Sequence, residues 1–260
     1  MKIAIIGYGK MGKMIEQVAH AQGHAIAAIV DPLAEHAGIP VSKNIDEVNL
    51  NSVDAAIEFS QPASAVSNIT ALAKKKIPTV TGTTGWHERM NEVEKEIKKS
   101  GSSLLWASNF SIGVNLFYCI AWYASELVNN FDEYDVGGFE AHHNKKLDSP
   151  SGTAKILVEG VLSRIERKKK IIWETMNRKP EADELHFPSL RMGSVPGTHS
   201  LFFDSSADTI EISHTARSRE GFASGAVRAA QWLAAKKRHG IFTIDEMLKD
   251  IWNRRGSLKI

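Results

Sequence analysis

The amino-terminal segment constrains the fold more than any other part of the chain. An apolar run, KIAIIG, leads into residues 7–12, whose GYGKMG has the spacing G-x-G-x-x-G, and a helical pattern follows from Lys13. A second apolar run ends at Asp31, about 20 residues beyond the last glycine. Glycines at this spacing permit a tight turn and a close approach of backbone to a pyrophosphate, and the carboxylate accepts ribose hydroxyls. This context predicts a β-α-β unit that binds a dinucleotide.

Short apolar runs and helical patterns continue to alternate up to about residue 110, through VDAAIEFS, IPTVTG and SSLLWAS. This alternation indicates right-handed βαβ units around a parallel sheet, and we predict an α/β fold with a Rossmann-type domain. Residues 82–85 and 107–110 each follow one of these runs, at the carboxyl edge where open α/β sheets bind ligands. The predicted cofactor-binding residues are Gly7, Tyr8, Gly9, Lys10, Met11, Gly12, Asp31, Gly82, Thr83, Thr84, Ala107, Ser108, Asn109 and Phe110.

The residue at the end of the second run indicates which dinucleotide is preferred. Asp31 favours NADH, because a carboxylate at that position repels a 2′-phosphate. Lys10 and Lys13 can offset this repulsion, so use of NADPH stays open.

The pattern changes after Asn109. One long apolar helical stretch spans residues 112–128, and the strand-like segments LRMG, HSLFFD and TIEISHT follow later, joined by short turns. Consecutive strands of this kind favour an antiparallel or mixed sheet, so we predict a second α+β domain with a mixed open sheet. The tail returns to helical patterns, one of which starts with the capping-box spacing Thr243 to Glu246. The predicted dinucleotide-binding domain comprises residues 1–110 and 218–260, and residues 111–217 form the second domain.

The segment EAHHNKKLDSPSGTA, residues 140–154, concentrates two histidines, two lysines and a Ser-Gly-Thr step before a helical pattern over residues 154–167. Backbone N–H groups at a helix start bind anions, so Ser151, Gly152 and Thr153 predict a site for a small, strongly acidic substrate. Neighbouring histidines beside lysines at such a site favour chemistry over a purely structural role. Lys145 and Lys146 are not distinguished by this reasoning.

We predict no metal site. His142 and His143 are neighbours, and on a strand adjacent side chains point to opposite faces, so they cannot ligate one ion together. The chain has no H-E-x-x-H pattern, and its single cysteine, Cys119, lies in an apolar run.

Charge and hydropathy exclude several classes of partner. With 32 basic and 30 acidic residues the formal net charge is +2, so bulk charge does not recruit nucleic acid or anionic lipid. The longest apolar helical stretch contains Asn115 and Glu126 and is too short to span a bilayer, and the amino-terminal apolar run is too short for a signal peptide. We therefore expect a cytoplasmic protein that binds neither nucleic acid nor membrane.

Taken together, EAHHNKKLDSPSGTA, GTTGW, SNFSIGVN, RMGSVPGTH and SREGFASGAV closely resemble the dihydrodipicolinate reductase family, also called 4-hydroxy-tetrahydrodipicolinate reductases. The resemblance covers nearly the whole chain in order. It implies an NAD(P)H-dependent reduction in diaminopimelate and lysine biosynthesis, with a small dicarboxylate as substrate. It also implies a homotetramer joined through the sheet of the second domain, which is then the substrate-binding and oligomerisation domain.

The resemblance also assigns roles to residues. The catalytic histidine of the family matches His142, its proton-donating lysine matches Lys146, and its substrate-contacting residues match His143, Gly152 and Thr153. Hydride comes from the nicotinamide and the proton from Lys146 or His142. Some family members have an acidic residue followed by arginine after the second strand, whereas Asp31 precedes Pro32 here, which cannot bind a 2′-phosphate.

Two other functions are compatible with the same motifs. One is a two-domain Rossmann reductase for a different acidic imine or carbonyl compound, since a fold does not determine its substrate. The other is a regulator that senses NAD(H), which would need a DNA-binding helix pair or a large basic face; the sequence shows neither.

Overall fold

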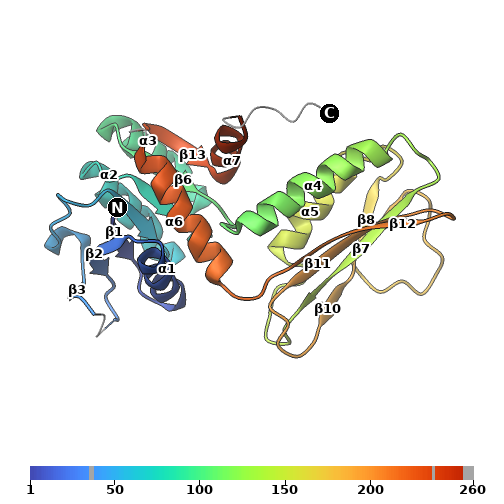
Figure 1. Ribbon diagram of the computed structural model, residues 1–260, viewed down its shortest axis with the longest axis horizontal. Coiled ribbons are helices and arrows are strands. Elements are labelled where there is room, and N and C mark those ends of the chain that lie inside the picture. Colours follow the sequence, from blue (N-terminus) through green and yellow to red (C-terminus); the bar gives the residue numbers. More distant parts are fainter. Residues whose placement is uncertain (35–37, 236–237, 254–260) are drawn as a thin grey trace. The chain divides into compact units, whose positions relative to one another are not determined.

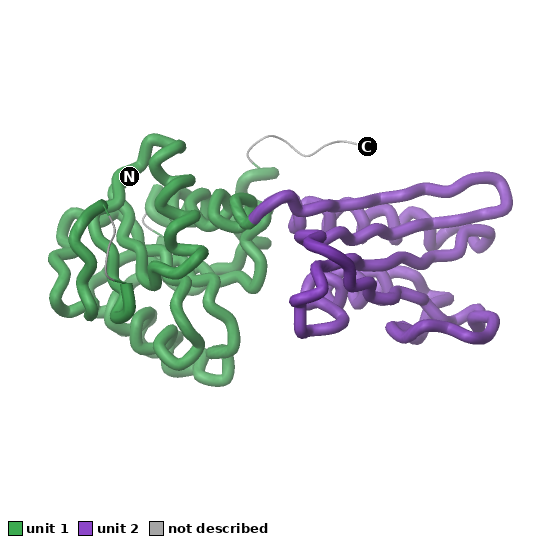
Figure 2. Tube along the Cα trace, turned by 90° about the horizontal axis from the view of Figure 1, so that it is seen from below, with its two compact units in different colours: residues 1–111, 219–260 green, residues 112–218 purple. Residues whose placement is uncertain are grey.

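The computed structural model describes residues 1–34, 38–235 and 238–253. The chain divides into two compact units, shown in different colours in Figure 2. Unit 1 comprises Met1–Ser111 and Arg219–Ile260, and unit 2 comprises Ile112–Ser218. These boundaries lie one residue from those expected from the sequence.

Unit 1 is built on a seven-stranded sheet in which every pair of neighbouring strands is parallel, in the order β13-β6-β5-β4-β1-β2-β3 (Figure 1). The strands are β1 (Lys2–Ile6), β2 (Ala25–Val30), β3 (Val41–Ser42), β4 (Ala55–Glu58), β5 (Thr79–Thr81), β6 (Ser103–Trp106) and β13 (Gly240–Thr243). This sheet confirms the predicted Rossmann-type fold. The edge strand β13 was not predicted, because only helical patterns were recognised in the tail.

Helices cover both faces of this sheet. They are α1 (Lys10–Ala21), α2 (Pro62–Lys74), α3 (Met90–Ser100), α6 (Glu220–Ala235) and α7 (Ile244–Asn253), with short 3-10 turns at Ile45–Glu47 and His87–Arg89. On one face α2 packs on the β1 side chains Ala4 and Ile6, and on the other α1 approaches Ile5 and lies beside α6. Successive side chains of a strand alternate between the two faces of the sheet. The buried apolar residues of β1, Ile3 to Ile6, therefore contribute to the core on both faces.

Two helix starts differ in how well they were predicted. The capping box at α7 is confirmed, since the Thr243 N–H donates to the Glu246 carboxylate at 2.7 Å. In contrast, α1 begins at Lys10, three residues before the predicted Lys13, directly after the glycine turn.

Glycine is required at the turn between β1 and α1. Gly7 has φ +90°, and a Cβ there would lie 2.3 Å from the Phe59 carbonyl oxygen. A Cβ at Gly12 would lie 2.2 Å from the Gly7 carbonyl oxygen, so this glycine lets α1 pack against the turn. The two glycines bring the start of α1 to the end of β1.

Unit 2 is built on a four-stranded sheet in the order β10-β7-β11-β12. Its strands are β7 (Asp135–His142), β10 (Ser189–Arg191), β11 (Thr198–Asp204) and β12 (Thr209–Thr215). The β10 and β7 strands are parallel and the other two pairs are antiparallel, which confirms the predicted mixed sheet. A separate parallel pair, β8 (Lys170–Ile172) with β9 (Glu184–His186), was not predicted.

One face of the four-stranded sheet packs on α4 (Ile112–Val128) and α5 (Gly152–Leu162), with Leu201 and Phe203 in a common core. On the opposite face the rings of Phe139 and Phe202 stack with their centroids 6.1 Å apart. The α5 helix ends at Leu162, five residues before the predicted end. Beyond it the chain turns so that the buried Lys168 ammonium reaches the carbonyls of Ala182 and Glu184 at 3.0 and 2.8 Å. None of the described helices is both long and apolar enough to cross a membrane.

Candidate functional site

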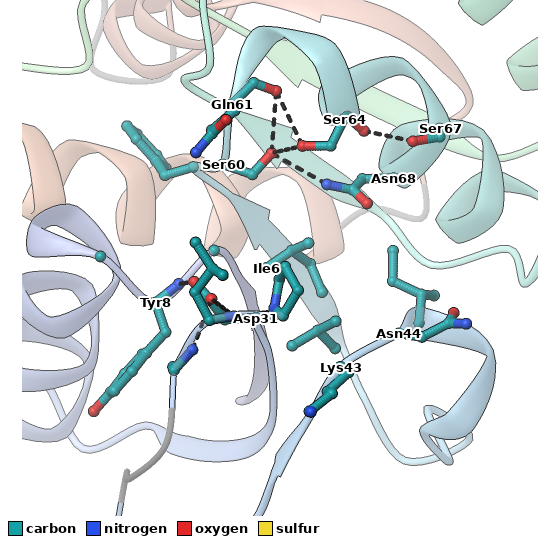
Figure 3. Close-up of a pocket in the computed structure, with 18 of the residues that line it drawn as sticks. Ile6, Tyr8, Asp31, Lys43, Asn44, Ser60, Gln61, Ser64, Ser67 and Asn68 are labelled. Atoms are coloured by element: carbon teal, nitrogen blue, oxygen red, sulfur yellow. Dashed lines mark hydrogen bonds between the residues drawn. The ribbon is translucent and has the colours of Figure 1, made fainter.

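A cleft of about 1270 Å³ lies in unit 1 beside the turn between β1 and α1 (Figure 3). Four of the predicted cofactor residues line it: Gly7, Tyr8, Gly9 and Asp31. Residues that were not predicted complete the wall, among them Lys43, Asn44, Ser60, Ser64 and Asn68. Lys43 and Asn44 follow β3, Ser60 follows β4, and Ser64 and Asn68 lie on α2. The sequence pattern in these segments indicated loop and helix but contained no ligand-binding motif.

The residues around the turn fit a dinucleotide. A Cβ at Gly9 would meet nothing within 4 Å, so the backbone is open to a ligand at this point. Gly9 is also the residue before α1, its position offers no side-chain cap, and the first turn contains no acidic side chain. The first N–H groups of α1 can therefore bind a pyrophosphate, with Lys10 and Lys13 adding positive charge nearby.

Asp31 lies immediately after β2 at the edge of this cleft. Its Oδ2 accepts the Tyr8 N–H at 2.6 Å, and its Oδ1 accepts the N–H groups of Leu33 and Ala34 at 2.8 and 3.0 Å. A carboxylate oxygen has two lone-pair directions, so Oδ2, which accepts one hydrogen bond within the protein, can accept another from a ligand. Asp31 thus organises the loop after β2 and presents negative charge in the cleft.

The other predicted cofactor residues are outside the lining of this cleft. Lys10 is exposed, Met11 is half-buried and Gly12 is covered by the glycine turn. Thr83 and Thr84 follow β5, where the Thr83 hydroxyl accepts the Ser60 N–H at 2.9 Å. The remaining residues, Gly82, Ala107, Ser108, Asn109 and Phe110, follow β5 and β6 at the carboxyl edge of the sheet. The Phe110 side chain is buried, so only its backbone can face a ligand.

A buried carboxylate, Glu58, ends β4 beneath this cleft. Its Oε1 accepts the Ser60 hydroxyl and, at 3.2 Å, the Ser60 N–H, while its Oε2 accepts the Thr81 hydroxyl at 2.5 Å. The Asn68 amide adds a contact at 3.5 Å. Glu58 therefore ties the ends of β4 and β5 to α2, and its hydrogen-bond donors are neutral.

The histidines and lysines of unit 2 come together at the end of β7. His142 is the last residue of the strand and is buried, whereas His143 begins the following loop and is half-buried. Because the strand ends between them, the alternation of faces expected for neighbours on a strand does not apply to this pair. The Lys146 ammonium pairs with the Asp148 carboxylate at 2.8 Å, and its side chain is 22% exposed, whereas Lys145 is exposed.

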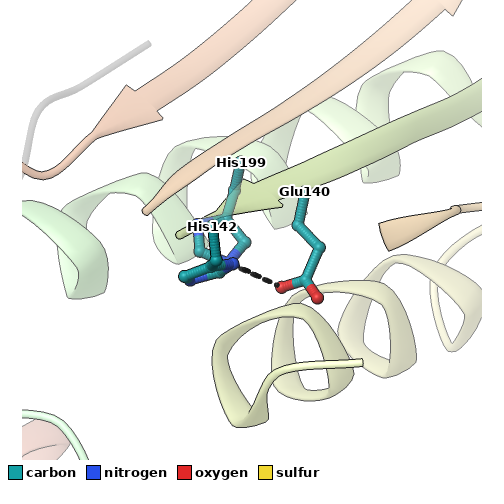
Figure 4. A group of neighbouring side chains, drawn as sticks. All are labelled: Glu140, His142 and His199. Atoms are coloured by element: carbon teal, nitrogen blue, oxygen red, sulfur yellow. Dashed lines mark ion pairs between the residues drawn. The ribbon is translucent and has the colours of Figure 1, made fainter. Parts of the chain in front are cut away.

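Glu140 and His199 join His142 in a group that was not predicted (Figure 4). Glu140 lies two residues before His142 on the same face of β7, and His199 is opposite Glu140 in the register of β11. The Glu140 Oε2 lies 3.4 Å from His142 Nδ1 and 3.4 Å from His199 Nε2. The sequence signal for two members of this group is a glutamate and a histidine two residues apart on a strand, because such residues share a face.

Other polar groups surround the second Glu140 oxygen. Oε1 accepts the Ser151 N–H at 3.0 Å and the Ser189 hydroxyl at 2.6 Å, and Arg191 Nη2 lies at 3.3 Å. The same Arg191 nitrogen donates to the Asp148 carbonyl at 2.7 Å. The Glu140 carboxylate is thereby connected to the loop that holds Lys146.

Burial and neighbouring charge set the protonation of this group. Burial lowers the pKa of His142 to about 4, and the charges of His199, Lys146 and Arg191 act in the same direction, against the attraction of Glu140. Burial by itself raises the pKa of the Glu140 carboxyl, but contacts from His199, Ser151 and Ser189 outweigh it and hold the pKa well below its usual range. At neutral pH the site therefore contains a neutral His142 and an ionised Glu140.

The predicted anion site at the start of α5 has a defined cap. The Ser151 hydroxyl accepts the Ala154 N–H at 3.1 Å and lies 3.2 Å from His199 Nε2, and the Ser151 N–H is bonded to Glu140. Ser151 is thus engaged within the protein. Gly152 is exposed and Thr153 is half-buried, and both belong to the first turn of α5, the positive end of the helix.

The donor atoms of Glu140, His142 and His199 all lie within 4.8 Å of one another, a spacing that a transition-metal ion can use. The prediction of no metal rested on His142 with His143, on the absence of an H-E-x-x-H pattern and on the lack of a cysteine partner, and it did not consider this set. The guanidinium of Arg191 at 3.3 Å already supplies positive charge to the Glu140 carboxylate, and that charge disfavours a divalent cation.

Unit 1 has the parallel sheet and glycine turn of dinucleotide-dependent oxidoreductases, and comparison with known proteins identifies the family within that class. Residues 1–110 match the family described as "Dihydrodipicolinate reductase, N-terminus", and residues 113–248 match "Dihydrodipicolinate reductase, C-terminus". The chain belongs to the dihydrodipicolinate reductase family.

Individual relatives agree over almost their full lengths. The chain is 39% identical to the 4-hydroxy-tetrahydrodipicolinate reductase of Christiangramia forsetii, covering 97% of this chain and 99% of that one. It is 32% identical to the reductase of the same name from Archaeoglobus fulgidus, covering 96% and 100%. A dipicolinate-bound dihydrodipicolinate reductase from Paenisporosarcina sp. TG-14 has the same fold, with a TM-score of 0.75 at 19% identity over 94% of this chain and 97% of that chain.

Proposed function

We propose that the chain catalyses the NAD(P)H-dependent reduction of 4-hydroxy-tetrahydrodipicolinate to tetrahydrodipicolinate in the diaminopimelate route to lysine, in the cytoplasm. Family membership over both halves of the chain supports the activity. The observation that best supports the site is the loop after β7, where Lys146 adjoins the ionised Glu140 network and the α5 start.

Lys146 is the better candidate for the proton donor. His142, with a pKa lowered to about 4, is neutral at pH 7 and has no dissociable imidazolium proton to give. The Lys146 side chain is partly exposed and reaches the loop surface, so it can approach a bound molecule. When bound, reduced nicotinamide supplies the hydride. In this proposal Lys146 protonates the substrate, and His142 shapes and polarises the site as a neutral group.

The substrate is proposed to be held by its carboxylates. One carboxylate accepts the N–H groups of Gly152 and Thr153 at the positive end of α5. The other half of the molecule faces His143 and Lys146, and the buried Nδ1 of His143 has no hydrogen-bond partner in the described part of the chain. Ser151 acts indirectly, by capping α5 and by linking it to Glu140.

For the cofactor we propose a preference for NADH with some use of NADPH. The Asp31 carboxylate in the cleft favours ribose hydroxyls over a 2′-phosphate, and Pro32 after it contributes no donor. Lys13 and Lys43 line the same cleft and reduce the repulsion that a 2′-phosphate would meet there.

We also propose a homotetramer joined through the outer face of the four-stranded sheet. This face presents the stacked rings of Phe139 and Phe202 together with Leu190, which is 44% exposed. Apolar groups gathered on the outer side of a sheet favour burial against another copy. Light scattering after size-exclusion chromatography would test this, and a Phe202→Glu chain should elute as a smaller species.

The activity is tested in a coupled assay. The substrate is generated by its synthase from pyruvate and aspartate semialdehyde, and the loss of reduced-nicotinamide absorbance is followed with NADH and NADPH in parallel. Oxidation that depends on the synthase is the expected result. A protein that binds NADH but oxidises neither cofactor under these conditions would refute the substrate assignment while leaving the nucleotide unit intact.

A further inference from the structure

Glu140 and His199 place further buried polar side chains beside His142, the proposed site histidine. All three side chains are buried, on a sheet face that is otherwise covered by apolar residues such as Val136 and Leu201. Burying polar groups in such surroundings costs free energy unless they are paired. The arrangement therefore calls for a role beyond packing.

The contacts of Glu140 divide between its two oxygens. Oε1 receives the donors from Ser151, Ser189 and Arg191 and is anchored on the protein framework. Oε2 has no conventional hydrogen bond, and its nearest groups are His142 Nδ1 and His199 Nε2, both at 3.4 Å. An ionised carboxylate can only accept, so each of these ring nitrogens is suited to carry the hydrogen that faces Oε2.

We propose that Glu140 and His199 are positioning residues, which hold the His142 ring in one orientation with its proton on Nδ1 and connect it to the Ser151 cap of α5. His199 takes part in both halves of this connection, because its Nε2 lies 3.4 Å from Glu140 and 3.2 Å from the Ser151 hydroxyl. Its ring also stands at 75° to that of His142, with centroids 5.2 Å apart, and so limits rotation of the His142 ring.

Fixing the Nδ1 proton leaves His142 Nε2 as an acceptor. Nε2 lies 3.0 Å from the position of a Cβ at Gly197, where φ is +148°, so glycine at this point leaves room beside the ring. The network thus settles which nitrogen accepts and where it lies. The inference rests on the proposed role of His142 in the reductase site. The geometry of Glu140, His142 and His199 itself is independent of that role.

The titratable and charged groups that face His142 come from several elements. They are Glu140 on β7, His199 on β11, Arg191 on β10 and Lys146 in the loop after β7. Burial lowers the pKa of His214 on β12, and His199 in turn acts on it in the same direction. Among them Glu140 is the one whose charge favours protonated His142.

The first test uses the free protein and needs no substrate. Nitrogen-15 NMR of the histidine rings reports which nitrogen of His142 is protonated, and assignment by loss of the signal in His142→Gln identifies it. The wild type is expected to show a single Nδ1–H tautomer. In Glu140→Gln the side-chain amide can present its NH₂ group to Nδ1, so the proton should move to Nε2 or the two tautomers should mix.

The second test measures turnover in the coupled assay. Misplacing a reacting group lowers turnover without a comparable change in cofactor binding, so Glu140→Gln should reduce kcat about 10- to 100-fold while KM for NADH stays the same. His199→Phe, which keeps an aromatic ring but loses both polar contacts, should have a smaller effect in the same direction. Glu184→Gln is the matched control, because Glu184 is also a buried carboxylate of unit 2, bonded to Arg178 instead of to histidine.

The outcomes separate this inference from the proposed function. A wild type without reductase activity would refute the proposed function, while the tautomer measurement would still decide whether Glu140 orients His142. An unchanged His142 tautomer in Glu140→Gln, or a loss of kcat no larger than in Glu184→Gln, would overturn the positioning role. So would tight binding of one zinc ion per chain with both ring signals shifted, because the three groups would then be metal ligands.

Discussion

Among the described residues, each unit has one glutamate that is 0% exposed, Glu58 in unit 1 and Glu140 in unit 2. Both lie at or near the carboxyl end of a strand, and their surroundings differ. Glu58 in unit 1 is bonded to the hydroxyls of Ser60 and Thr81, which carry no charge. Glu140 in unit 2 is surrounded by Arg191 and two imidazoles as well as by hydroxyls. Hydroxyl donors add no charge around a carboxylate, whereas a histidine can gain a proton and so change the charge beside it. The comparison suggests that Glu58 organises backbone and that Glu140 acts on reactive groups.

The largest expected effect tests whether the reaction takes place beside Glu140, at the loop that holds Lys146. Replacing Lys146 by alanine should lower kcat about 10²- to 10⁴-fold, because it removes the proposed proton donor. Steady-state kinetics in the coupled assay would measure it, with Lys145→Ala as the control for a nearby exposed lysine. A Lys146→Ala protein with wild-type kcat would contradict the assignment of the proton donor.

The next effect concerns stability at acid pH, which should depend on His142 and Glu140 in unit 2. His142 has a pKa of about 4 in the folded chain against 6.5 ordinarily, so the unfolded chain takes up this proton first as the pH falls. The free energy of unfolding should therefore decrease between pH 6.5 and about 4, by up to about 3 kcal/mol from this residue. Glu140, whose pKa is lowered, adds to the loss at still lower pH.

Urea unfolding at a series of pH values would measure this loss. His142→Gln should show a shallower decline over the same interval, whereas His20→Gln, at an exposed position, should behave like the wild type. Equal slopes for the wild type and His142→Gln would show that His142 is not held neutral by the fold.

A smaller effect is expected at Glu58. Glu58→Gln places an NH₂ group among donors that need an acceptor, which should cost about 1–3 kcal/mol of unfolding free energy. Because its partners are neutral, the pH dependence of kcat should keep its wild-type shape. A displaced pH profile would show that this carboxylate also acts on the reaction and would remove the contrast with Glu140.

The smallest effect concerns cofactor choice in unit 1. Asp31→Asn keeps an oxygen acceptor for the loop and loses the negative charge, so the NADPH-to-NADH ratio of kcat/KM should rise about tenfold, equivalent to about 1.4 kcal/mol. Asp46→Asn is the control, since Asp46 lines the same cleft but is 77% exposed. If both variants changed the ratio equally, the general charge of the cleft would matter more than the position of Asp31.

Much of the fold could be predicted because its pattern is local. The apolar runs of unit 1 are buried on both faces, and the helices between them have clear periodicity, so the parallel sheet follows from the order of elements. Strand β13 was missed because four residues between two helices give too short a pattern. Strands β8 and β9 were missed for a similar reason, since each has three residues.

The site was predictable where it is contiguous in sequence. Residues 140–154 place His142, Lys146 and the α5 start within one segment, and their proximity needs no knowledge of register. The partners of Glu140 come instead from β10 and β11, and the pairing of His199 with Glu140 depends on how two strands align. A shift of one residue would turn His199 to the other face, and the sequence alone does not exclude that shift.

The position of β13 also bears on how the chain acquires its structure during synthesis. This strand pairs with β6, yet all of unit 2 and α6 lie between them in sequence. As a ribosome makes the chain from its amino terminus, every residue of unit 2 is available before residues 240–243 exist, and β6 remains an open edge until then. The unit encoded in the middle of the chain can thus complete its sheet first, and the nucleotide unit that begins the chain completes its sheet last.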